Sequence, residues 1–186
     1  GKVTVVTGAA SGIGRGLVHA FAGSGASVVA ADVDAAALSE TAAKDPDRIT
    51  TVVTDVSQFA SVDALADRAF EQYGTVDVLC NNAGVFAGGL IWERPVTDYE
   101  WTLGVNLWGI LHGIRAFVPR FLASGRPAHI VDTVSMAGLC STPFTAPYNI
   151  SKFAALAASE CLAHDLAAVG APIGVSALCP EAVATG

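Results

Sequence analysis

Short apolar runs alternate with longer segments in which apolar residues recur at helical spacing along the 186 residues of the chain. Within the short runs most consecutive positions are apolar, a pattern typical of strands covered on both faces in a parallel sheet. The pattern predicts six strands, the fourth taken together with its turn: 3–7, 27–32, 49–55, 76–84, 128–135 and 173–179.

The segments between these runs predict five helices, at 13–25, 35–43, 58–73, 98–123 and 147–169. Thr97 and Glu100 form a capping-box pattern before the fourth helix, and Pro147 suits the first turn of the fifth. Strict alternation of strands and helices predicts a three-layer α/β fold of the doubly wound Rossmann type. Its parallel strands would be joined by right-handed crossovers.

The segment 98–123 is apolar nearly all round, so both of its sides are expected to be buried. Gly104, Gly109 and Gly113 carry no side chain and would let a second backbone approach closely. We therefore predict that this helix pairs with a helix of another subunit.

Composition narrows the class of protein. Hydrophobic residues make up 52% of the chain and charged residues 15%, which suits a buried parallel sheet covered by helices. The net charge of −7 and the scattered Lys and Arg argue against a nucleic-acid partner. No apolar run reaches the ~18 residues of a membrane span, and the chain enters a strand at once. Neither a membrane segment nor a signal peptide is therefore expected.

The positions of the cysteine and histidine residues bear on metal binding and on the redox state of the protein. The four Cys and four His are dispersed, without the paired spacing of metal ligands, so no metal site is expected. The cysteines fit small buried side chains of a reduced protein, which favours the cytoplasm.

TGAASGIG, residues 7–14, lies between a predicted strand and a predicted helix, the context in which a glycine-rich turn suggests a nucleotide site. Gly8 would permit the sharp turn, Gly12 would let the backbone approach a pyrophosphate, and Gly14 would allow close packing. The helix N-terminus that follows offers N–H donors and the positive end of a dipole. Glycines that merely end a strand are the alternative.

Asp32 ends the second predicted strand, about twenty residues after the glycines, where a carboxylate accepts hydrogen bonds from an adenosine ribose. A carboxylate about 4 Å from a 2′-phosphate would cost on the order of a few kcal/mol. No Arg or Lys directly follows Asp32, and Ser11 is not basic. These residues predict NAD rather than NADP as cofactor, with a solvated Asp at a strand end as the alternative.

Tyr148 and Lys152 stand four residues apart near the start of the last predicted helix, so their side chains share one face. An ammonium group one turn away favours a phenolate, which could exchange a proton with an alcohol or carbonyl oxygen. Ser135 ends the fifth predicted strand and could hold the same oxygen. Asn106 lies among apolar residues and needs a buried partner, and NNAG, 81–84, follows the fourth strand where Rossmann ligands bind. Taken singly, each also fits a packing or turn role.

Together these motifs resemble the short-chain dehydrogenase/reductase family. TGAASGIG matches that family's glycine motif, and NNAG, Asn106, Ser135 and the Tyr148/Lys152 pair match in order, over residues 3 to about 185. The resemblance implies that Tyr148 is the catalytic acid/base and that Lys152 binds the nicotinamide ribose and favours the phenolate. It also implies that Ser135 orients the substrate oxygen and that Asn106 holds a water in a proton relay.

The resemblance further implies a set of NAD contacts from the glycine turn to the end of the chain. The implied contacts are Gly8, Ser11, Gly12, Ile13, Gly14, Asp32, Val33, Asp55, Val56, Asn82, Ala83, Gly84, Tyr148, Lys152, Pro180, Val183 and Thr185. One position departs from the family, because Glu181 stands where Gly usually follows the Pro. Glu181 places a carboxylate near the cofactor and costs backbone freedom if a positive φ is needed.

The resulting hypothesis is an NAD-dependent oxidoreductase that interconverts a secondary alcohol and a ketone by hydride transfer. Apolar side chains expected around the substrate favour an apolar, alicyclic or steroid-like compound: Phe86, Leu90, Trp92, Met136, Leu139 and Phe144. Two alternatives stay open. One is a reductase or dehydratase of acyl-type substrates on the same scaffold, and the other is a non-catalytic NAD-binding or sensor protein.

The resembled family also implies what surrounds this domain. Its members continue beyond the position of Thr185 with a substrate loop and a seventh strand. We therefore expect residues 1–186 to form a single Rossmann domain that lacks this loop and the last strand. The family further implies a homo-oligomer, a tetramer built as a dimer of dimers.

Overall fold

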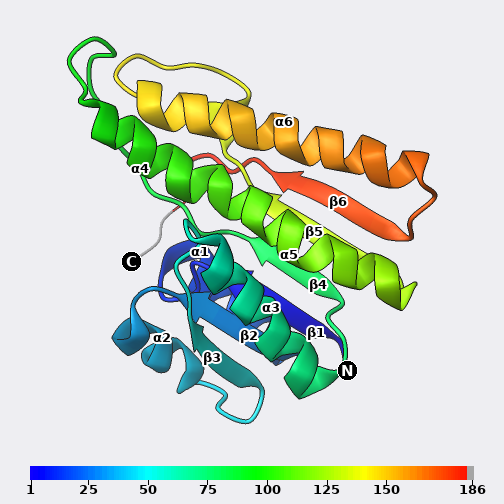
Figure 1. Ribbon diagram of the computed structural model, residues 1–186. Helices are drawn as coiled ribbons and strands as arrows, with labels where there is room; N and C mark the ends of the chain where they lie inside the picture. Colours follow the sequence, from blue (N-terminus) through cyan, green and yellow to red (C-terminus); the bar gives the residue numbers. More distant parts are fainter. Residues whose placement is uncertain (184–186) are drawn as a thin grey trace.

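The computed structural model describes residues 1–183 and contains one parallel sheet with helices on both faces (Figure 1). The strands are β1 (Val3–Thr7), β2 (Ser27–Asp32), β3 (Ile49–Val53), β4 (Val78–Asn81), β5 (Ala128–Thr133) and β6 (Ile173–Leu178). They lie in the order β3-β2-β1-β4-β5-β6, and every neighbouring pair is parallel. The predicted doubly wound Rossmann-type fold is confirmed.

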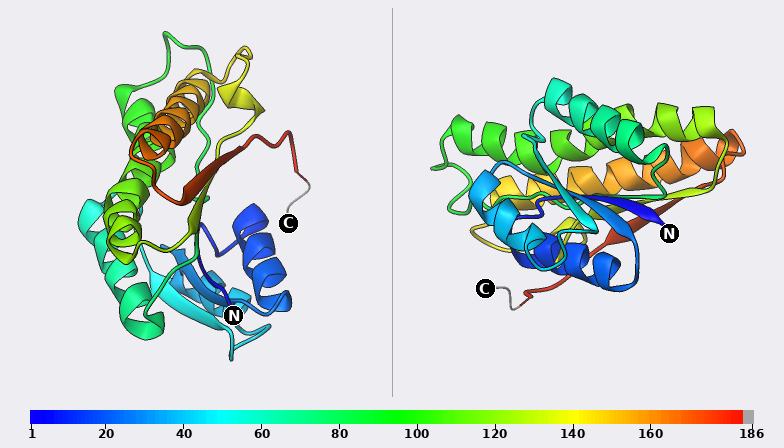
Figure 2. Two further views of the ribbon diagram at one scale, coloured as in Figure 1. Left: turned by 90° about the vertical axis from the view of Figure 1, so that its right-hand side faces the viewer. Right: turned by 90° about the horizontal axis from the view of Figure 1, so that it is seen from below.

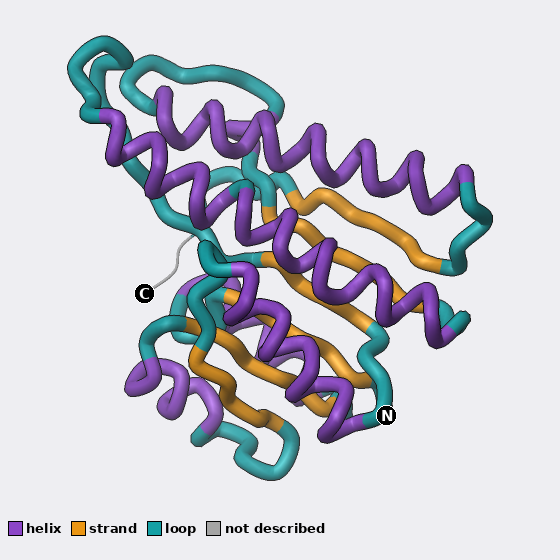
Figure 3. Tube along the Cα trace, in the orientation of Figure 1, coloured by secondary structure: helices purple, strands orange, loops and turns teal. Residues whose placement is uncertain are grey.

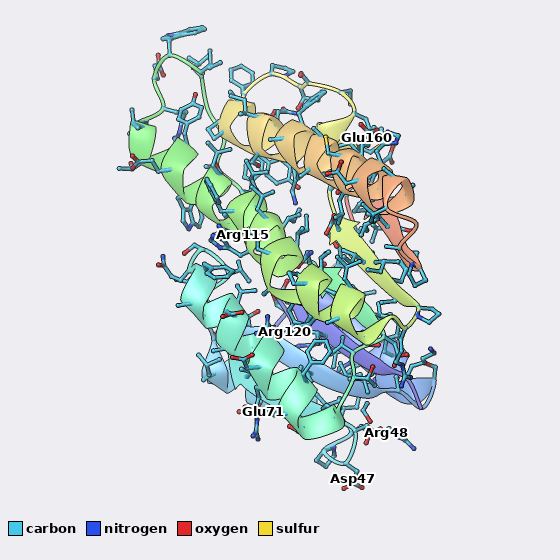
Figure 4. The ribbon with its side chains drawn as sticks, turned by 45° about the vertical axis from the view of Figure 1, so that its right-hand side comes forward. Asp47, Arg48, Glu71, Arg115, Arg120 and Glu160 are labelled. Atoms are coloured by element: carbon cyan, nitrogen blue, oxygen red, sulfur yellow. The ribbon has the colours of Figure 1, made fainter. Side chains whose placement is uncertain are left out.

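Helices form the two outer layers. They are α1 (Gly12–Gly23), α2 (Ala35–Ala42), α3 (Phe59–Tyr73), α4 (Val96–Asn106), α5 (Trp108–Ser124) and α6 (Ala146–Ala168), with a short 3-10 helix η1 (Met136–Gly138) after β5. α1 and α2 cover one face of the sheet, and α3 to α6 cover the other (Figure 2). Arg120 of α5 reaches across to α3 and pairs with Asp63 and Asp67 (Figure 4).

Apolar side chains fill the space between the sheet and both helical layers, which explains why the strands are nearly continuous apolar runs. Leu65, Phe117 and Ile130 are buried on the side of α3, α5 and α6. Val18 and Leu38 are buried on the side of α1 and α2. Burying one such side chain contributes about 1.5–3 kcal/mol, so the two layers hold the strand ends in place.

The predicted third and fifth strands run two residues too far at their carboxyl ends. β3 ends at Val53 and β5 at Thr133. Beyond these points single main-chain bonds still reach the neighbouring strand, from the N–H of Thr54 to Asp32 and from that of Val134 to Leu178, while short polar side chains bind nearby main-chain N–H groups. Asp55 accepts from the N–H of Ser57 at 2.9 Å, and Ser135 accepts from that of Ala137 at 3.1 Å. Such local bonds favour turns over strands.

The predicted single helix over 98–123 is two helices, α4 and α5, which meet at Leu107. Leu107 has φ −103° and ψ −57°, away from the about −63° and −42° of a regular α-helix. The capping box predicted at Thr97 and Glu100 is also wrong. α4 begins after Pro95, whose extended backbone starts the helix without a side-chain cap.

Two of the three glycines in this region face the interior of their own chain. A Cβ on Gly113 would lie 2.1 Å from Oδ1 of Asn81, and one on Gly109 would lie 2.9 Å from Cγ2 of Val56. Gly104 lines the cavity described below. The prediction that these glycines admit a backbone of another subunit is therefore wrong. They let α4 and α5 lie close to the sheet and the loops at its edge.

Three further properties concern the described part of the chain. None of its helices combines the length and hydropathy of a membrane-spanning segment. No group of three His, Cys, Asp or Glu side chains among residues 1–183 is arranged to hold a metal ion. Burial, with a smaller effect of Asp132, raises the pKa of the Cys80 thiol to about 12, so this cysteine is an unreactive core residue.

The carboxyl ends of all six strands point to one edge of the sheet, on the left in Figure 1. From β1 the chain adds strands first on one side and then, with β4, on the other, and such switch points are where open α/β sheets bind ligands. Two loops, 82–95 and 134–145, project side by side beyond this edge (Figure 3). They are joined where the N–H of Gly89 donates to the carbonyl of Phe144 at 2.7 Å.

Candidate active site

A cavity of about 1490 Å³ opens at the carboxyl edge of the sheet. Most of the site positions predicted from sequence converge on it, from all six strand ends and from α6. They are Gly8, Ser11, Gly12, Ile13, Gly14, Asp32, Val33, Asp55, Val56, Asn82, Ala83, Gly84, Ser135, Tyr148, Lys152, Pro180 and Val183. Asn106 lies behind the cavity wall, and Thr185 lies outside the described residues.

The turn between β1 and α1 has a shape that favours glycine. Gly8 has φ +67° and Gly12 φ +52°, both in the left-handed region. A Cβ on Gly14 would lie 1.9 Å from the main-chain oxygen of Gly8, so the strand and helix approach too closely for a larger residue. Ser11 occupies the N-cap of α1 without a side-chain hydrogen bond. The first N–H groups of α1 are thus free of a side-chain cap at the cavity, where they suit an anion.

Asn82 connects the ends of three neighbouring strands by hydrogen bonds. Its Nδ2 donates to the carbonyl of Thr7 at 3.0 Å, and its main-chain N–H donates to Oγ1 of the same residue at 3.0 Å. Its Oδ1 accepts from Oγ1 of Thr133 at 3.1 Å. These bonds connect β1, β4 and β5, and so fix the spacing between the glycine turn and the loop that carries Ser135.

Asp32 is the last residue of β2, and its side chain lies at the cavity. Oδ2 accepts from the N–H of Ala10 at 3.0 Å, and Oδ1 accepts from that of Asp34 at 3.1 Å. Both bonds hold the carboxylate beside the glycine turn. Among the described residues that line the cavity, Lys152 is the one basic side chain, so none of them neutralises a phosphate next to Asp32.

Ser135 and Tyr148 line the same cavity. The Oγ of Ser135 accepts from the N–H of Ala137 at 3.1 Å, which leaves its own proton free to donate. Tyr148 lies in the first turn of α6, directly after Pro147, as predicted. Its ring packs against that of Phe86, with centroids 5.2 Å apart.

Lys152 is 3% exposed and reaches from α6 toward the end of β5. Its Nζ donates to the carbonyl of Thr133 at 2.8 Å and lies 5.7 Å from the centroid of the Tyr148 ring. Burial lowers the pKa of Lys152 to about 8, although the charge of Asp132 acts in the opposite direction. A pKa of about 8 still leaves the side chain mostly protonated at neutral pH.

Asp132 is a fully buried carboxylate beneath this lysine. Its Oδ1 accepts from Nδ2 of Asn81 at 2.8 Å, and its Oδ2 accepts from Oγ of Ser159 at 2.7 Å. Burial raises the pKa of Asp132, while these hydrogen bonds and the charge of Lys152 lower it. The lysine and the aspartate are therefore coupled through the interior, each favouring the charged form of the other.

Asn106 ends α4 and is fully buried. Its Oδ1 accepts from the N–H of Val85 at 2.8 Å, and its Nδ2 donates to the carbonyl of Val85 and to Oγ of Ser151, both at 2.9 Å. The predicted buried partner is confirmed. A Cβ on Gly84 would lie 3.4 Å from Oδ1 of Asn106 and 3.5 Å from Nζ of Lys152, so both side chains lie directly behind this glycine.

The order and geometry of these residues agree with a comparison of the whole chain with known families. Residues 2–186 match the family described as short chain dehydrogenase. The chain belongs to this family. The resemblance inferred from the motifs is thereby confirmed, and this short-chain dehydrogenase is an oxidoreductase with a small-molecule substrate.

Three known proteins illustrate the similarity. The 1-deoxy-11-beta-hydroxypentalenate dehydrogenase of Streptomyces avermitilis is 46% identical over 190 residues, covering 99% of this chain and 69% of the relative. The 3beta-hydroxysteroid dehydrogenase 2 of Eggerthella lenta is 36% identical over 184 residues, covering 97% and 70%. A structure of a short-chain dehydrogenase/reductase from Burkholderia phymatum in complex with NAD matches with a TM-score of 0.97 and 47% identity, covering 100% and 67%.

The apolar residues expected around the substrate fall into three groups in this short-chain dehydrogenase. Phe86 and Met136 line the large cavity. Leu90, Trp92 and Phe144 line a second cavity of about 320 Å³ between the two projecting loops. Leu139 lines neither of these cavities and is exposed, so its place at the substrate stays a prediction.

Several cavity residues carry no motif and were missed. α4 contributes Glu100 and Trp101, and the loop after β3 contributes Ser57 and Gln58. They reach the cavity only because α4 lies beside that loop, which no local pattern encodes. Glu181, which departs from the family pattern, also lines the cavity.

Proposed function

We propose that this protein is an NAD-dependent oxidoreductase that interconverts an apolar secondary alcohol and the corresponding ketone by hydride transfer. One observation carries the proposal. Ser135, Tyr148 and Lys152 share a single cavity with the glycine turn and Asp32. A proton-transferring group and a nucleotide site in one cavity are what a nicotinamide-dependent dehydrogenase requires.

The residues present fit NAD. Gly8 and Gly14 leave no room for a Cβ, the first turn of α1 lacks a side-chain cap, and Asp32 offers its carboxylate beside them. Phosphate oxygens suit the N–H groups of the helix start, and ribose hydroxyls suit the carboxylate. When bound, the nicotinamide would take up or release the hydride. The NAD complex of the Burkholderia phymatum relative supports this choice.

The chain's own side chains would handle the proton. Tyr148 would take the hydroxyl proton of the alcohol, or give a proton to the ketone oxygen. Ser135 would donate to the same oxygen, because its Oγ already accepts from Ala137 and its proton is free. Lys152, held by the carbonyl of Thr133, would place positive charge near Tyr148 and bind the nicotinamide ribose. Asn106 would hold a relay water. It would not do so through its two amide protons, because these already bind Val85 and Ser151.

The substrate proposal rests on the walls of the site. Phe86 and Met136 border the large cavity, and Leu90, Trp92 and Phe144 line the smaller cavity between the two projecting loops. Such walls favour a compound with an apolar body. The names of the relatives, a hydroxypentalenate and a hydroxysteroid dehydrogenase, support a hydroxyl group on a larger skeleton.

A substrate screen tests the proposal. The purified protein is incubated with NAD and a panel of alicyclic and steroid alcohols, small hydroxy acids and acyl-type hydroxy compounds, and NADH absorbance is followed. We expect turnover of apolar secondary alcohols and on the order of a 10²–10⁴-fold loss in Tyr148→Phe, with NAD affinity nearly unchanged. Turnover confined to acyl-type compounds would favour the acyl reductase instead. Tight NAD binding without any turnover would favour a sensor, and full activity of Tyr148→Phe would refute the mechanism.

A further inference from the structure

The chain between Ser135 and Tyr148 forms one wall of the site and joins its two proton-handling residues. It begins with η1 and carries Phe144, the one described non-glycine residue with a positive φ, at +64°. It also passes close over α6. A Cβ on Gly138 would lie 2.8 Å from the main-chain oxygen of Lys152. The position of this segment therefore affects the separation of Ser135 from Tyr148.

Asn149, the residue after Tyr148, binds this segment at four points. Its Nδ2 donates to the carbonyls of Ala137 at 2.8 Å and Cys140 at 2.9 Å. Its Oδ1 accepts from the N–H of Thr142 at 3.4 Å and from Oγ1 of Thr145. Only 5% of Asn149 is exposed, so these bonds are made away from water. One amide thus uses both its protons and both its lone pairs on a single segment.

One of these contacts continues to the hydroxyl of Ser135. The main-chain N–H of Ala137 donates to Ser135 Oγ at 3.1 Å. The carbonyl of the same residue accepts from Asn149. Ser135 is thereby connected, through one residue, to the neighbour of Tyr148 on α6.

We propose that Asn149 is a positioning residue that holds the Ser135 hydroxyl in register with Tyr148 by binding the 137–145 segment. The inference rests on the proposed function, because it requires Ser135 and Tyr148 to act on one substrate oxygen. Asn149 does not line either cavity. Asn149 therefore affects the reaction by positioning Ser135. A residue that only stabilises the fold would lower activity whether or not Ser135 is present.

A double-mutant cycle tests this dependence. Asn149→Ala, Ser135→Ala and the double variant are compared for kcat, KM and NAD affinity. We expect Asn149→Ala to lower kcat on the order of 10- to 100-fold, since displacement of a catalytic group by about 1 Å has an effect of this size. NAD affinity stays within about twofold. In the Ser135→Ala background the same change costs no more than about twofold, because the group it positions is already gone.

Asp77→Ala is the matched control. Asp77 is also buried, and it accepts from Lys2 and from the N–H of Val3 at the opposite edge of the sheet. We expect it to lower the melting temperature without changing kcat. If Asn149→Ala fails to fold, Asn149→Asp replaces it, because it keeps the side-chain size and removes both donors to the carbonyls. Equal losses from Asn149→Ala in the two Ser135 backgrounds would overturn the proposal.

Hydrogen exchange of the cofactor-free protein gives a readout that does not depend on turnover. Peptides within 136–145 are expected to lose protection in Asn149→Ala and to keep it in Asp77→Ala. Unchanged protection in Asn149→Ala would overturn the proposal whatever the kinetics. A wild-type protein that turns over no substrate would refute the proposed function, and with it any catalytic role of Asn149, even if the exchange result stands.

Discussion

Lys152 is a residue whose pKa depends strongly on its surroundings. It is buried, it donates to the carbonyl of Thr133, and the Asp132 carboxylate lies deeper in the same interior. Burial lowers its pKa to about 8, whereas Asp132 and Cys179 raise it. The protein therefore retains a cation that its own fold disfavours, as expected for a group kept for chemistry rather than stability.

Replacing Lys152 by Met should reveal this cost as a dependence of stability on pH. The folded protein releases the Lys152 proton near pH 8, whereas the unfolded chain holds it until about 10.5. Between these values the unfolded state binds more protons, so the free energy of unfolding of the wild type rises with pH. Lys152→Met lacks this rise. We expect the difference between the two proteins to shift by about 3 kcal/mol in favour of the wild type as pH increases across this window.

Urea unfolding at both ends of the window measures the shift, and other titrating groups cancel in the difference. Lys44→Met, on an exposed side chain, serves as the control and should show no such shift. A Lys152→Met protein that keeps a constant difference from the wild type would contradict the lowered pKa.

Asp32 should decide between NAD and NADP. Its carboxylate repels a 2′-phosphate, and the described cavity offers no basic group beside it. Asp32→Asn should lower the ratio of kcat/KM for NAD over NADP by at least about tenfold, which corresponds to about 1.4 kcal/mol. Asp34→Asn removes the same charge two residues away, where Asp34 caps α2, and should leave the ratio unchanged. A wild-type preference for NADP would contradict the assignment.

The residues of the candidate site could be recognised from sequence where chemistry requires a particular side chain at a particular spacing. Gly8, Asp32 and the Tyr148/Lys152 pair are of this kind, and all four lie at the cavity. Asn149 was not recognised, although it follows Tyr148 directly. Its four partners all lie in the loop just before it, but no residue pattern indicates that this loop folds back onto its amide.

The helices and strands, too, were predictable from sequence only in part. Strands buried on both faces were predictable because apolar runs record burial, but their carboxyl ends were not, because Asp55 and Ser135 bind local N–H groups. The break at Leu107 was also missed. It adjoins Asn106, whose three side-chain bonds to Val85 and Ser151 are tertiary contacts. Helix propensity does not depend on such contacts, so it could not predict the break.

The β1–α1 unit allows a test with two glycines on one helix. A Cβ on Gly14 would lie 1.9 Å from the carbonyl oxygen of Gly8, whereas one on Gly16 would meet nothing within 4 Å. Gly14→Ala should therefore displace the turn, lowering stability by about 3 kcal/mol and weakening NAD binding. Gly16→Ala should raise stability by up to about 1 kcal/mol, because alanine favours the helix. Thermal unfolding and NAD titration measure both effects. Equal behaviour of the two variants would contradict the close approach.

The outer face of α4 and α5 predicts how two subunits pair. The exposed positions Trp101, Trp108, Arg115 and Leu122 recur every seven residues across both helices. Trp101, which also borders the cavity, is 51% exposed, Trp108 49% and Leu122 46%. A repeat of seven places these side chains in one stripe, three of them large and apolar, as at the seam between paired helices. This stripe, rather than the inward-facing glycines, is the surface expected to join two subunits.

Trp108→Glu should weaken that pairing, because it would bury a carboxylate against the same residue of a symmetric partner. Size-exclusion chromatography with light scattering should show an oligomer for the wild type and a smaller species for this variant. Val169→Glu places the same charge on a 71% exposed apolar residue just after α6, outside the stripe, and should keep the wild-type mass. If both variants keep the oligomer, the subunits pair through another face. A wild-type protein with the mass of a single chain would mean that two exposed tryptophans remain in water, and the predicted assembly would be wrong.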